Sequence, residues 1–224
     1  MKVSVVQGIL NANDQIALQN RQLLDEHGIC VLNIMASPGG GKTSLILRTI
    51  DALRDCLRIG VIEGDIASTV DADRVATRSV PVVQINTGGQ CHLDAPMVHR
   101  ALGQLPLEDL DLIMIENVGN LICPVDFKLG EDLKVMIASI PEGDDKPYKY
   151  PGIFLAVDAV VINKVDLLPY LHFDVAAFRQ LVMGMNPSVR IFEVSCETGQ
   201  GIQDWTEWVT KQREAKRQAV SSKQ

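Results

Sequence analysis

The sequence is poor in aromatic residues, in positive charge and in long apolar runs. Aromatic side chains make up 4% of the 224 residues, so we expect Leu, Ile, Val and Ala to fill most of the core. The formal net charge is −7, and no basic cluster offsets it, which argues against a nucleic-acid partner. No apolar run approaches the roughly 18 residues of a membrane helix, and no secretory leader is recognisable. We therefore expect a cytoplasmic protein without a membrane partner.

Cysteine is also scarce. The five cysteines are an odd number and are widely spread, so we expect thiols or metal ligands instead of disulfides. Isolated cysteines are most often small buried hydrophobic side chains. We expect that role for Cys30, Cys56 and Cys196.

Short apolar runs alternate with helical patterns along the chain. The patterns predict strands at 30–36, 58–63, 81–86, 110–116, 134–139, 159–163 and 190–195. They predict helices at 9–27, 42–55, 70–78, 95–104, 174–185 and 201–218, and a loop at 141–152. This alternation predicts an α/β fold with a mostly parallel sheet and helices on both faces. With no linker evident, we expect one domain over 1–224, in which 1–28 form an N-terminal helical extension and 29–224 the core.

The glycine-rich segment ASPGGGKTS lies between the first predicted strand and a predicted helix. It fits the phosphate-binding pattern G-x-x-x-x-G-K-[ST] except at Ala36, which stands in place of the first glycine. Glycines let the backbone aim its N–H groups at a phosphate, and the helix N-terminus adds its dipole. Lys42 is predicted to reach the β- and γ-phosphates, and Thr43 to ligate Mg²⁺. The predicted P-loop residues are Gly39, Gly40, Gly41, Lys42, Thr43 and Ser44.

The segment NKVD, residues 163–166, ends a predicted strand and favours guanine over adenine. Asp166 can accept hydrogen bonds from the guanine N1–H and 2-amino groups, and adenine offers neither donor. Asn163 is expected to tie this loop to the P-loop or the base, and the stem of Lys164 to cover the ring. The later segment SCETGQG lies where a GTPase carries its last base-contacting loop. Its predicted contributors are Ser195, Cys196 and Glu197.

The segment ENVG, residues 116–119, follows a strongly apolar predicted strand. GTPases commonly have D-x-x-G there, so Glu116 is a departure from that pattern, while Gly119 is retained and can approach the γ-phosphate closely. Loss of the γ-phosphate would release such a loop. Asp65 and Asp71 are candidates for Mg²⁺ coordination or for orienting water, with helix capping as the alternative. We predict Lys42, Asp65 and Glu116 as catalytic, and Thr43, Asp65 and Glu116 as the Mg²⁺ ligands.

Three soft ligands stand apart from the phosphate chemistry. Cys91 and His92 follow two glycines in a polar loop, and Cys123 lies four residues after Gly119. Thiolate and imidazole suit Ni²⁺ or Zn²⁺. A four-coordinate site would need water or a second chain as well. Because Cys123 follows ENVG so closely, nucleotide state is expected to bias the metal geometry or affinity.

These segments together resemble the HypB family, nickel-inserting SIMIBI-type P-loop GTPases of hydrogenase maturation. The likeness covers nearly the whole chain and rests on ASPGGGKTS, EGDIASTVDADR, NTGGQCHLDA, ENVGNLICP, EGDDKPYKYP and NKVDLLPYL. It implies GTP hydrolysis at or near a subunit interface, with Ni²⁺ or Zn²⁺ at Cys91, His92 and Cys123. It also implies a homodimer promoted by GTP, a HypA-type zinc and nickel protein, and a hydrogenase large-subunit precursor as partners.

The resemblance extends to the expected dimer contacts. Lys149, preferred over Lys146, is similar to a lysine that acts across the dimer in this family, and Leu167, Leu168 and Leu171 resemble its dimer contact. Helix packing is the alternative for these leucines. The N-terminal nickel-binding cysteine motif and the histidine-rich tract of some members are missing, so we expect a transfer protein and not a nickel store.

Other functions fit the motifs less well. The urease-serving GTPase has a related metal site, but the adjacent Cys91 and His92 and the segment ENVGNLICP favour the hydrogenase branch. The chaperone GTPase of cobalamin-dependent mutases should lack the metal residues. A small-molecule kinase would need an arginine-rich lid, and NKVD argues against it. Without an evident arginine finger, we expect slow hydrolysis.

Overall fold

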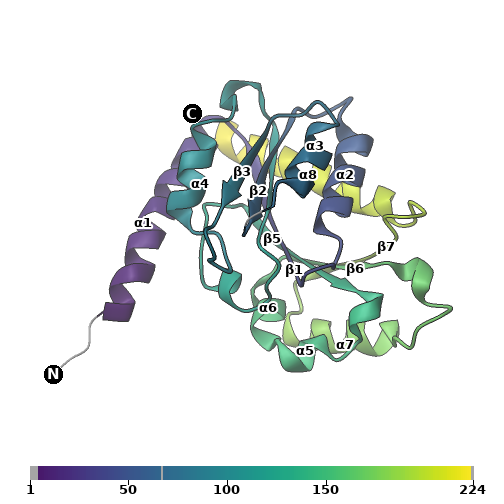
Figure 1. The fold of residues 1–224 in the computed structure, drawn as a ribbon. Helices are drawn as coiled ribbons and strands as arrows, with labels where there is room; N and C mark the ends of the chain where they lie inside the picture. The colour runs from purple at the N-terminus through teal and green to yellow at the C-terminus, as the bar shows by residue number, and fades with distance from the viewer. Residues whose placement is uncertain (1–4, 67, 223–224) are drawn as a thin grey trace.

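A computed structural model describes residues 5–66 and 68–222, with the backbone alone at 5–11 and 221. Seven parallel strands in this part of the chain form one sheet in the order β3-β2-β4-β1-β5-β6-β7 (Figure 1). The strands are β1 (Cys30–Ala36), β2 (Ile59–Asp65), β3 (Val82–Asn86), β4 (Leu112–Glu116), β5 (Leu133–Ser139), β6 (Ala159–Asn163) and β7 (Arg190–Val194). All seven predicted strands are confirmed, with ends that differ by at most two residues, and so is the α/β class.

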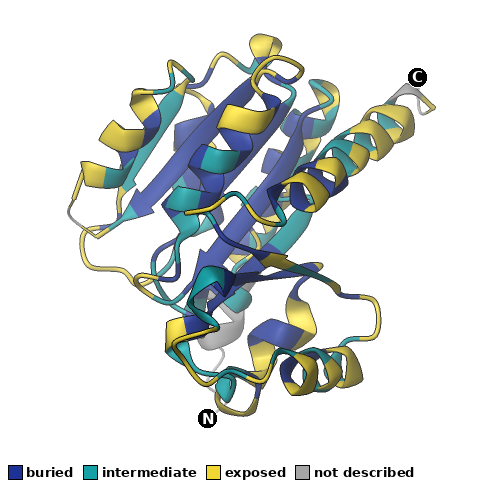
Figure 2. Cartoon of the chain, turned by 90° about the vertical axis from the view of Figure 1, so that its right-hand side faces the viewer, coloured by how far each residue is buried: buried dark blue, intermediate teal, exposed yellow. Residues whose placement is uncertain are grey.

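Helices cover both faces of this sheet. The helices are α1 (Val5–Glu26), α2 (Lys42–Leu53), α3 (Val70–Ala76), α4 (Ala95–Leu102), α5 (Lys146–Lys149), α6 (Pro151–Ala156), α7 (Val175–Met185) and α8 (Ile202–Ser221). One face packs against α2, α3 and α8 around Trp205 and Leu45. The opposite face divides into two clusters, one under α1 and α4 and one under α6 and α7. Figure 2 shows the strands buried between these layers, which places any accessible chemistry on the loops at the sheet edges.

The predicted loop at 141–152 is wrong in most of its length. A short 3-10 turn (Ile140–Glu142) is followed by α5 and α6. Pro147 and Pro151 lie in the first turns of these two helices, where proline costs little because the first helical N–H groups have no partner within the helix. The same prolines make the sequence look like a loop, so the pattern concealed the helices.

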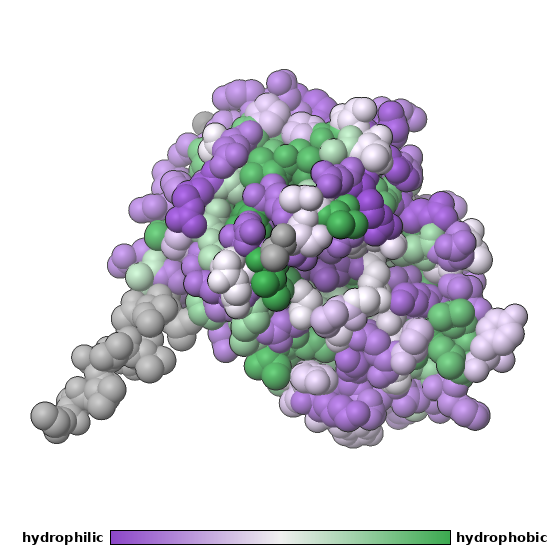
Figure 3. Space-filling view, viewed as in Figure 1, coloured by the Kyte–Doolittle hydropathy of each residue, from purple (hydrophilic) through white to green (hydrophobic). Residues whose placement is uncertain are grey.

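The three cysteines expected in the core differ in their burial. Cys30 is buried, and burial raises the pKa of its thiol to about 12. Cys196 is half-buried, and Cys56 is exposed, so the prediction for Cys56 is wrong. Among the described residues, no helix has both the length and the apolar character needed to cross a membrane. The face in Figure 3 is largely hydrophilic at its outline and carries hydrophobic residues in scattered patches.

Candidate functional site

The P-loop connects β1 in the middle of the sheet to α2. Lys42 and Thr43 open α2, and both side chains turn toward Glu116 at the end of the neighbouring strand β4. The Lys42 Nζ lies 3.7 Å from Glu116 Oε1, and the Thr43 hydroxyl donates to the same oxygen at 3.0 Å. The predicted phosphate-binding lysine, the predicted Mg²⁺ hydroxyl and the predicted switch carboxylate are therefore in contact within one chain.

Two further carboxylates join Glu116. Oxygen atoms of Glu63, Asp71 and Glu116 lie within 4.8 Å of one another, and the Oε2 atoms of Glu63 and Glu116 are buried without a hydrogen bond. Burial, and then the charge of Glu116, raise the pKa of Glu63 to about 10; burial also raises the pKa of Glu116. Unpaired buried oxygens next to a phosphate-binding loop fit a hard cation such as Mg²⁺.

The sequence alone did not identify Glu63 as part of this cluster. Its neighbours in β2 are apolar, and β2 and β4 pair in a register that sets Glu63 opposite Glu116. An ionisable residue inside an apolar strand was the available signal. Asp65, predicted as a Mg²⁺ ligand, accepts a hydrogen bond from the Ser68 N–H at 2.6 Å and is not one of the three clustered carboxylates.

The ENVG segment packs directly on the P-loop. A Cβ at Gly119 would lie 3.0 Å from Pro38 Cγ and Pro38 N, so only glycine permits this approach. Asn117 is fully buried; its amide donates to Asn33 Oδ1 at 3.1 Å, and its Oδ1 accepts from Leu93 N–H at 3.2 Å. The segment is thus bound to β1 and to the residue that follows His92.

The NKVD loop also holds the P-loop. Asn163 Nδ2 donates to Gly40 O at 3.1 Å, and Lys164 Nζ donates to Gly39 O at 2.8 Å. Ser195 donates its hydroxyl hydrogen to Asp166, which orients that carboxylate. A cavity of about 280 Å³ opens here, lined by Gly41, Ser44, Asn163, Lys164, Asp166, Leu167, Cys196 and Glu197. The structure therefore gathers the predicted base-binding residues around one pocket beside the P-loop.

A second lysine reaches the P-loop. Lys146 Nζ donates to Ser37 Oγ at 2.8 Å and to Glu142 Oε1 at 3.2 Å, and both members of this ion pair are largely buried. Glu142 in turn accepts from the N–H and the hydroxyl of Ser139, both at 3.0 Å. Burial opposes ionisation of Glu142, but the Ser37 hydroxyl, the Ser139 N–H and the charge of Lys146 outweigh it and lower the pKa of Glu142. The contact joins residues 109 positions apart, so no local pattern could have revealed it.

The residues predicted to contact a second subunit differ in their exposure. Lys149 is exposed and pairs with Asp145, four residues earlier. Leu171 is exposed, whereas Leu167 and Leu168 are half-buried against the cluster under α6 and α7. Their contact with a second chain remains a prediction.

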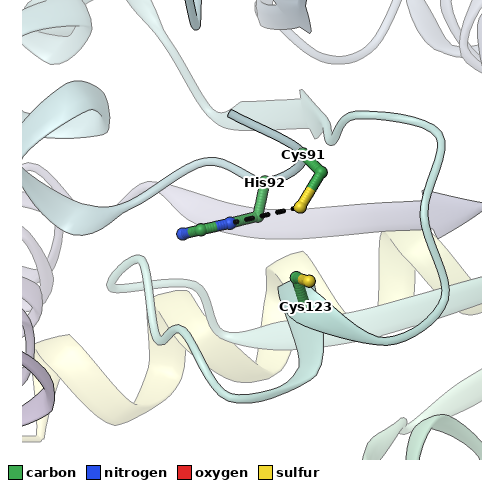
Figure 4. A group of neighbouring side chains, drawn as sticks. All are labelled: Cys91, His92 and Cys123. Atoms are coloured by element: carbon green, nitrogen blue, oxygen red, sulfur yellow. Dashed lines mark hydrogen bonds between the residues drawn. The ribbon is translucent and has the colours of Figure 1, made fainter. Parts of the chain in front are cut away.

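Figure 4 shows the three soft ligands facing one another. Cys91 and His92 come from the loop between β3 and α4, and Cys123 from a short turn after β4. The Cys91 Sγ lies 3.9 Å from His92 Nδ1, and ligand atoms of all three residues lie within 4.8 Å of one another. The structure thus brings together all three ligands predicted from the sequence.

The surroundings of this triad suit a soft cation. Burial lowers the pKa of His92, which favours the neutral imidazole that binds metals, and the ring stacks on Phe127 with centroids 3.9 Å apart. The neighbouring Cys123 thiol raises the pKa of Cys91, so a metal ion that binds there would displace the thiol proton. Asn120 donates to Cys91 O at 3.1 Å and so bridges the metal loop and the segment after ENVG. Three ligands leave one position of a tetrahedral site for water or another chain.

Comparisons with known proteins show which family this chain resembles. Residues 30–193 match the family model described as the CobW/HypB/UreG nucleotide-binding domain. The chain is 46% identical over 217 residues to the hydrogenase maturation factor HypB of Azotobacter chroococcum mcd 1, covering 97% of this chain and 71% of that protein. The crystal structure of HypB from Archaeoglobus fulgidus has a TM-score of 0.85 at 41% identity, covering 91% of this chain and 99% of that one. HypB from Helicobacter pylori in complex with nickel has a TM-score of 0.87 at 36% identity, covering 91% and 96%.

Proposed function

Because this chain belongs to the HypB family of hydrogenase maturation factors, we propose that it is a GTP-hydrolysing carrier that helps to insert nickel into a hydrogenase. The observation that carries this proposal is the short connection between two sites. Gly119 touches the P-loop, and Cys123, four residues later, faces Cys91 and His92. A change at the nucleotide can thereby reach the metal through a few residues of backbone.

Selectivity for GTP rests on Asp166. Held by the Ser195 hydroxyl at the pocket beside the P-loop, its carboxylate is placed to accept from the guanine N1–H and 2-amino groups. ATP offers the carboxylate neither of these donors, and losing hydrogen bonds to a charged group costs more than losing a contact between neutral groups. The same pocket and the NKVD loop favour this function over a small-molecule kinase.

Hydrolysis is proposed to use water as the acceptor. Lys42 and the P-loop N–H groups stabilise charge on the transferring phosphoryl group. Thr43 and Glu116, with Glu63, Asp71 or the predicted Asp65, would hold Mg²⁺, which when bound neutralises charge on the β- and γ-phosphates. We propose a slow intrinsic rate.

The bonds of Arg48, an arginine of α2, support the proposal of slow turnover. Arg48, on α2 just after the P-loop, donates to the carbonyls of Cys196 and Glu197 at 2.6 and 2.7 Å and so supports the base loop. That engagement keeps its guanidinium on the loop and away from the transferring group.

The cargo is proposed to be Ni²⁺, with Zn²⁺ as the other ion that the ligand set accepts. A homodimer that forms with GTP would complete the coordination, with Lys149, Leu167 and Leu171 in the contact. A HypA-type protein would exchange metal with it, and a hydrogenase large-subunit precursor would receive the nickel.

The test is nickel binding to the purified protein with GDP and with a non-hydrolysable GTP analogue, with molecular mass measured in the same samples. We expect nickel affinity and molecular mass to change together between the two nucleotide states. GTP hydrolysis would then control when the metal is released. Identical nickel affinity in both states would contradict the coupling and leave the metal triad as a static site.

A further inference from the structure

The first helix contacts both segments that carry the metal ligands. In α1, Asn13 and Asn20 are 4% and 0% exposed, which is unusual for asparagine unless every polar atom is satisfied. Both side chains form hydrogen bonds with two other segments of the chain. One segment follows Cys91 and His92 and begins α4, and the other follows Cys123.

Asn13 bridges the two segments with one amide group. Its Oδ1 accepts from the Ala95 N–H at 2.8 Å, three residues after His92. Its Nδ2 donates to Lys128 O at 2.9 Å, five residues after Cys123. Since one rigid amide makes both bonds, it fixes the spacing between the two backbones.

Asn20 repeats the bridge two turns further along α1. Its Nδ2 donates to Ala95 O at 3.0 Å and to Leu129 O at 2.9 Å, and its Oδ1 pairs with His99 Nδ1 at 2.7 Å. Ala95 is therefore held through both its N–H and its carbonyl by α1. These amides satisfy the Ala95 N–H, which has no partner in the first turn of α4, and the carbonyls of Lys128 and Leu129, which lie between helices and strands.

Packing around Gly130 supports the same contact. A Cβ built there would lie 2.6 Å from Asn20 Cβ and 2.9 Å from Ala17 O. The loop after Cys123 thus rests on the backbone of α1 without room for a methyl group.

We propose that α1 positions the metal ligands: Asn13 and Asn20 set the separation between the Cys91–His92 segment and the Cys123 segment. The inference rests on the proposed function, because it takes those three residues as the nickel ligands. Displacement of α1 would loosen the triad, so the helix is a control point for metal affinity.

The test is Ni²⁺ binding to the full chain carrying Asn13→Ala, Asn20→Ala or Gly130→Ala. We expect nickel affinity to fall by about tenfold, the scale seen for groups that orient metal ligands. The thiolate-to-nickel absorption band should shift as well, while GDP affinity stays within about twofold because the P-loop bonds do not involve α1.

The matched control is Asn186→Ala. Asn186 also donates its amide to two carbonyls, Phe154 O at 3.2 Å and Val157 O at 2.8 Å, but it follows α7 and holds the end of α6. If Asn186→Ala loses as much nickel affinity as the α1 variants, the loss reflects general destabilisation and the proposal is overturned. Wild-type nickel affinity in the α1 variants would overturn it as well.

A ligand variant separates this proposal from the function on which it rests. If Cys91→Ala binds nickel as the wild type does, the metal site itself is wrong. If Cys91→Ala loses nickel and the α1 variants do not, only the positioning role fails. Asn13→Ala removes a single bridge and serves if Asn20→Ala does not fold.

Discussion

The proposed nucleotide site and the proposed metal site lie at the same edge of the sheet but are built differently. The nucleotide site is closed by side chains of one chain: Lys42, Thr43 and Glu116 contact one another, and Asn163 and Lys164 bind the P-loop carbonyls. The metal site offers three ligands, and Cys91 is exposed.

This difference separates a preorganised site from an adjustable one. Buried groups with several hydrogen bonds hold one geometry, because breaking any bond leaves a polar atom unpaired. The ligand loops are held through the Asn13 and Asn20 bonds beyond the ligands, so a movement at those bonds would alter the ligand spacing. A carrier that must release its metal benefits from the second design, while phosphoryl transfer requires the first.

The largest expected effect is at the nucleotide site. Replacing Lys42 with Ala should lower GTP hydrolysis by at least about 10²–10³-fold, the scale of removing one group that stabilises transition-state charge. Phosphate release under single-turnover conditions measures it, with the exposed α8 residue Lys211 replaced by Ala as a control. Robust hydrolysis by Lys42→Ala would refute the site and, with it, the contrast between the two regions.

A substitution at the metal site should weaken nickel binding without changing GTP hydrolysis. We expect Cys123→Ala to weaken nickel binding by more than about tenfold, since even groups that merely orient ligands carry that much. GTP hydrolysis without nickel should change less than about twofold. Cys56, an exposed cysteine away from the triad, provides the control Cys56→Ala.

Unchanged nickel affinity of Cys123→Ala in both nucleotide states would contradict its role as a ligand. A loss of hydrolysis in the absence of metal would contradict the separation of the two sites instead. Isothermal titration of nickel with each nucleotide bound gives the affinities, and phosphate release from GTP without metal gives the hydrolysis rate.

Features set by short sequence patterns could be predicted, whereas contacts between residues far apart in the sequence could not. The strands, Cys91, His92 and Cys123 followed from short patterns, because parallel strands deliver their following loops to one edge. Glu63 and Lys146 could not be predicted from short patterns. The register of β2 and β4 places Glu63 beside Glu116, and Lys146 reaches Ser37 across 109 positions of the sequence. Asn13 and Asn20 read as polar positions of an amphipathic helix, and only the packing of α4 on α1 shows that they are buried.

Lys146 sharpens the comparison within the nucleotide site. Lys146→Met keeps much of the aliphatic stem but removes the bond to Ser37 and leaves Glu142 without its cation. We expect GDP affinity to fall by about tenfold, as for the loss of one hydrogen bond to a charged group. Fluorescent GDP titration measures it, with Lys149→Met as the control.

Lys149 is exposed and paired with Asp145, and its proposed role requires a GTP-dependent dimer. With GDP it should therefore have little effect. Equal loss of GDP affinity in Lys149→Met would show that the positive charge of the segment matters more than the contact with Ser37.

The smallest effect lies at the opposite edge of the sheet, where Asp111 precedes β4. Burial opposes ionisation of Asp111, but hydrogen bonds from Arg58 and Arg213 outweigh it and lower the pKa to about 2, against 3.8 for an unperturbed carboxyl. A lowered folded-state pKa stabilises the fold above about pH 4, and the stabilisation is lost as the pH falls toward 2.

Asp111→Asn should therefore lower the free energy of unfolding by about 1 kcal/mol at pH 7, less than the full pKa difference because solvent screens these ion pairs. Urea unfolding from pH 7 to pH 2.5 should show the difference from the wild type shrinking as the pH falls. Asp109→Asn, at an exposed neighbour 3.8 Å from Arg58, is the control and should change little. Nickel and GDP affinities should stay unchanged, because both sites are set at the other edge; a change in either would mean that the contrast between them depends on the whole sheet.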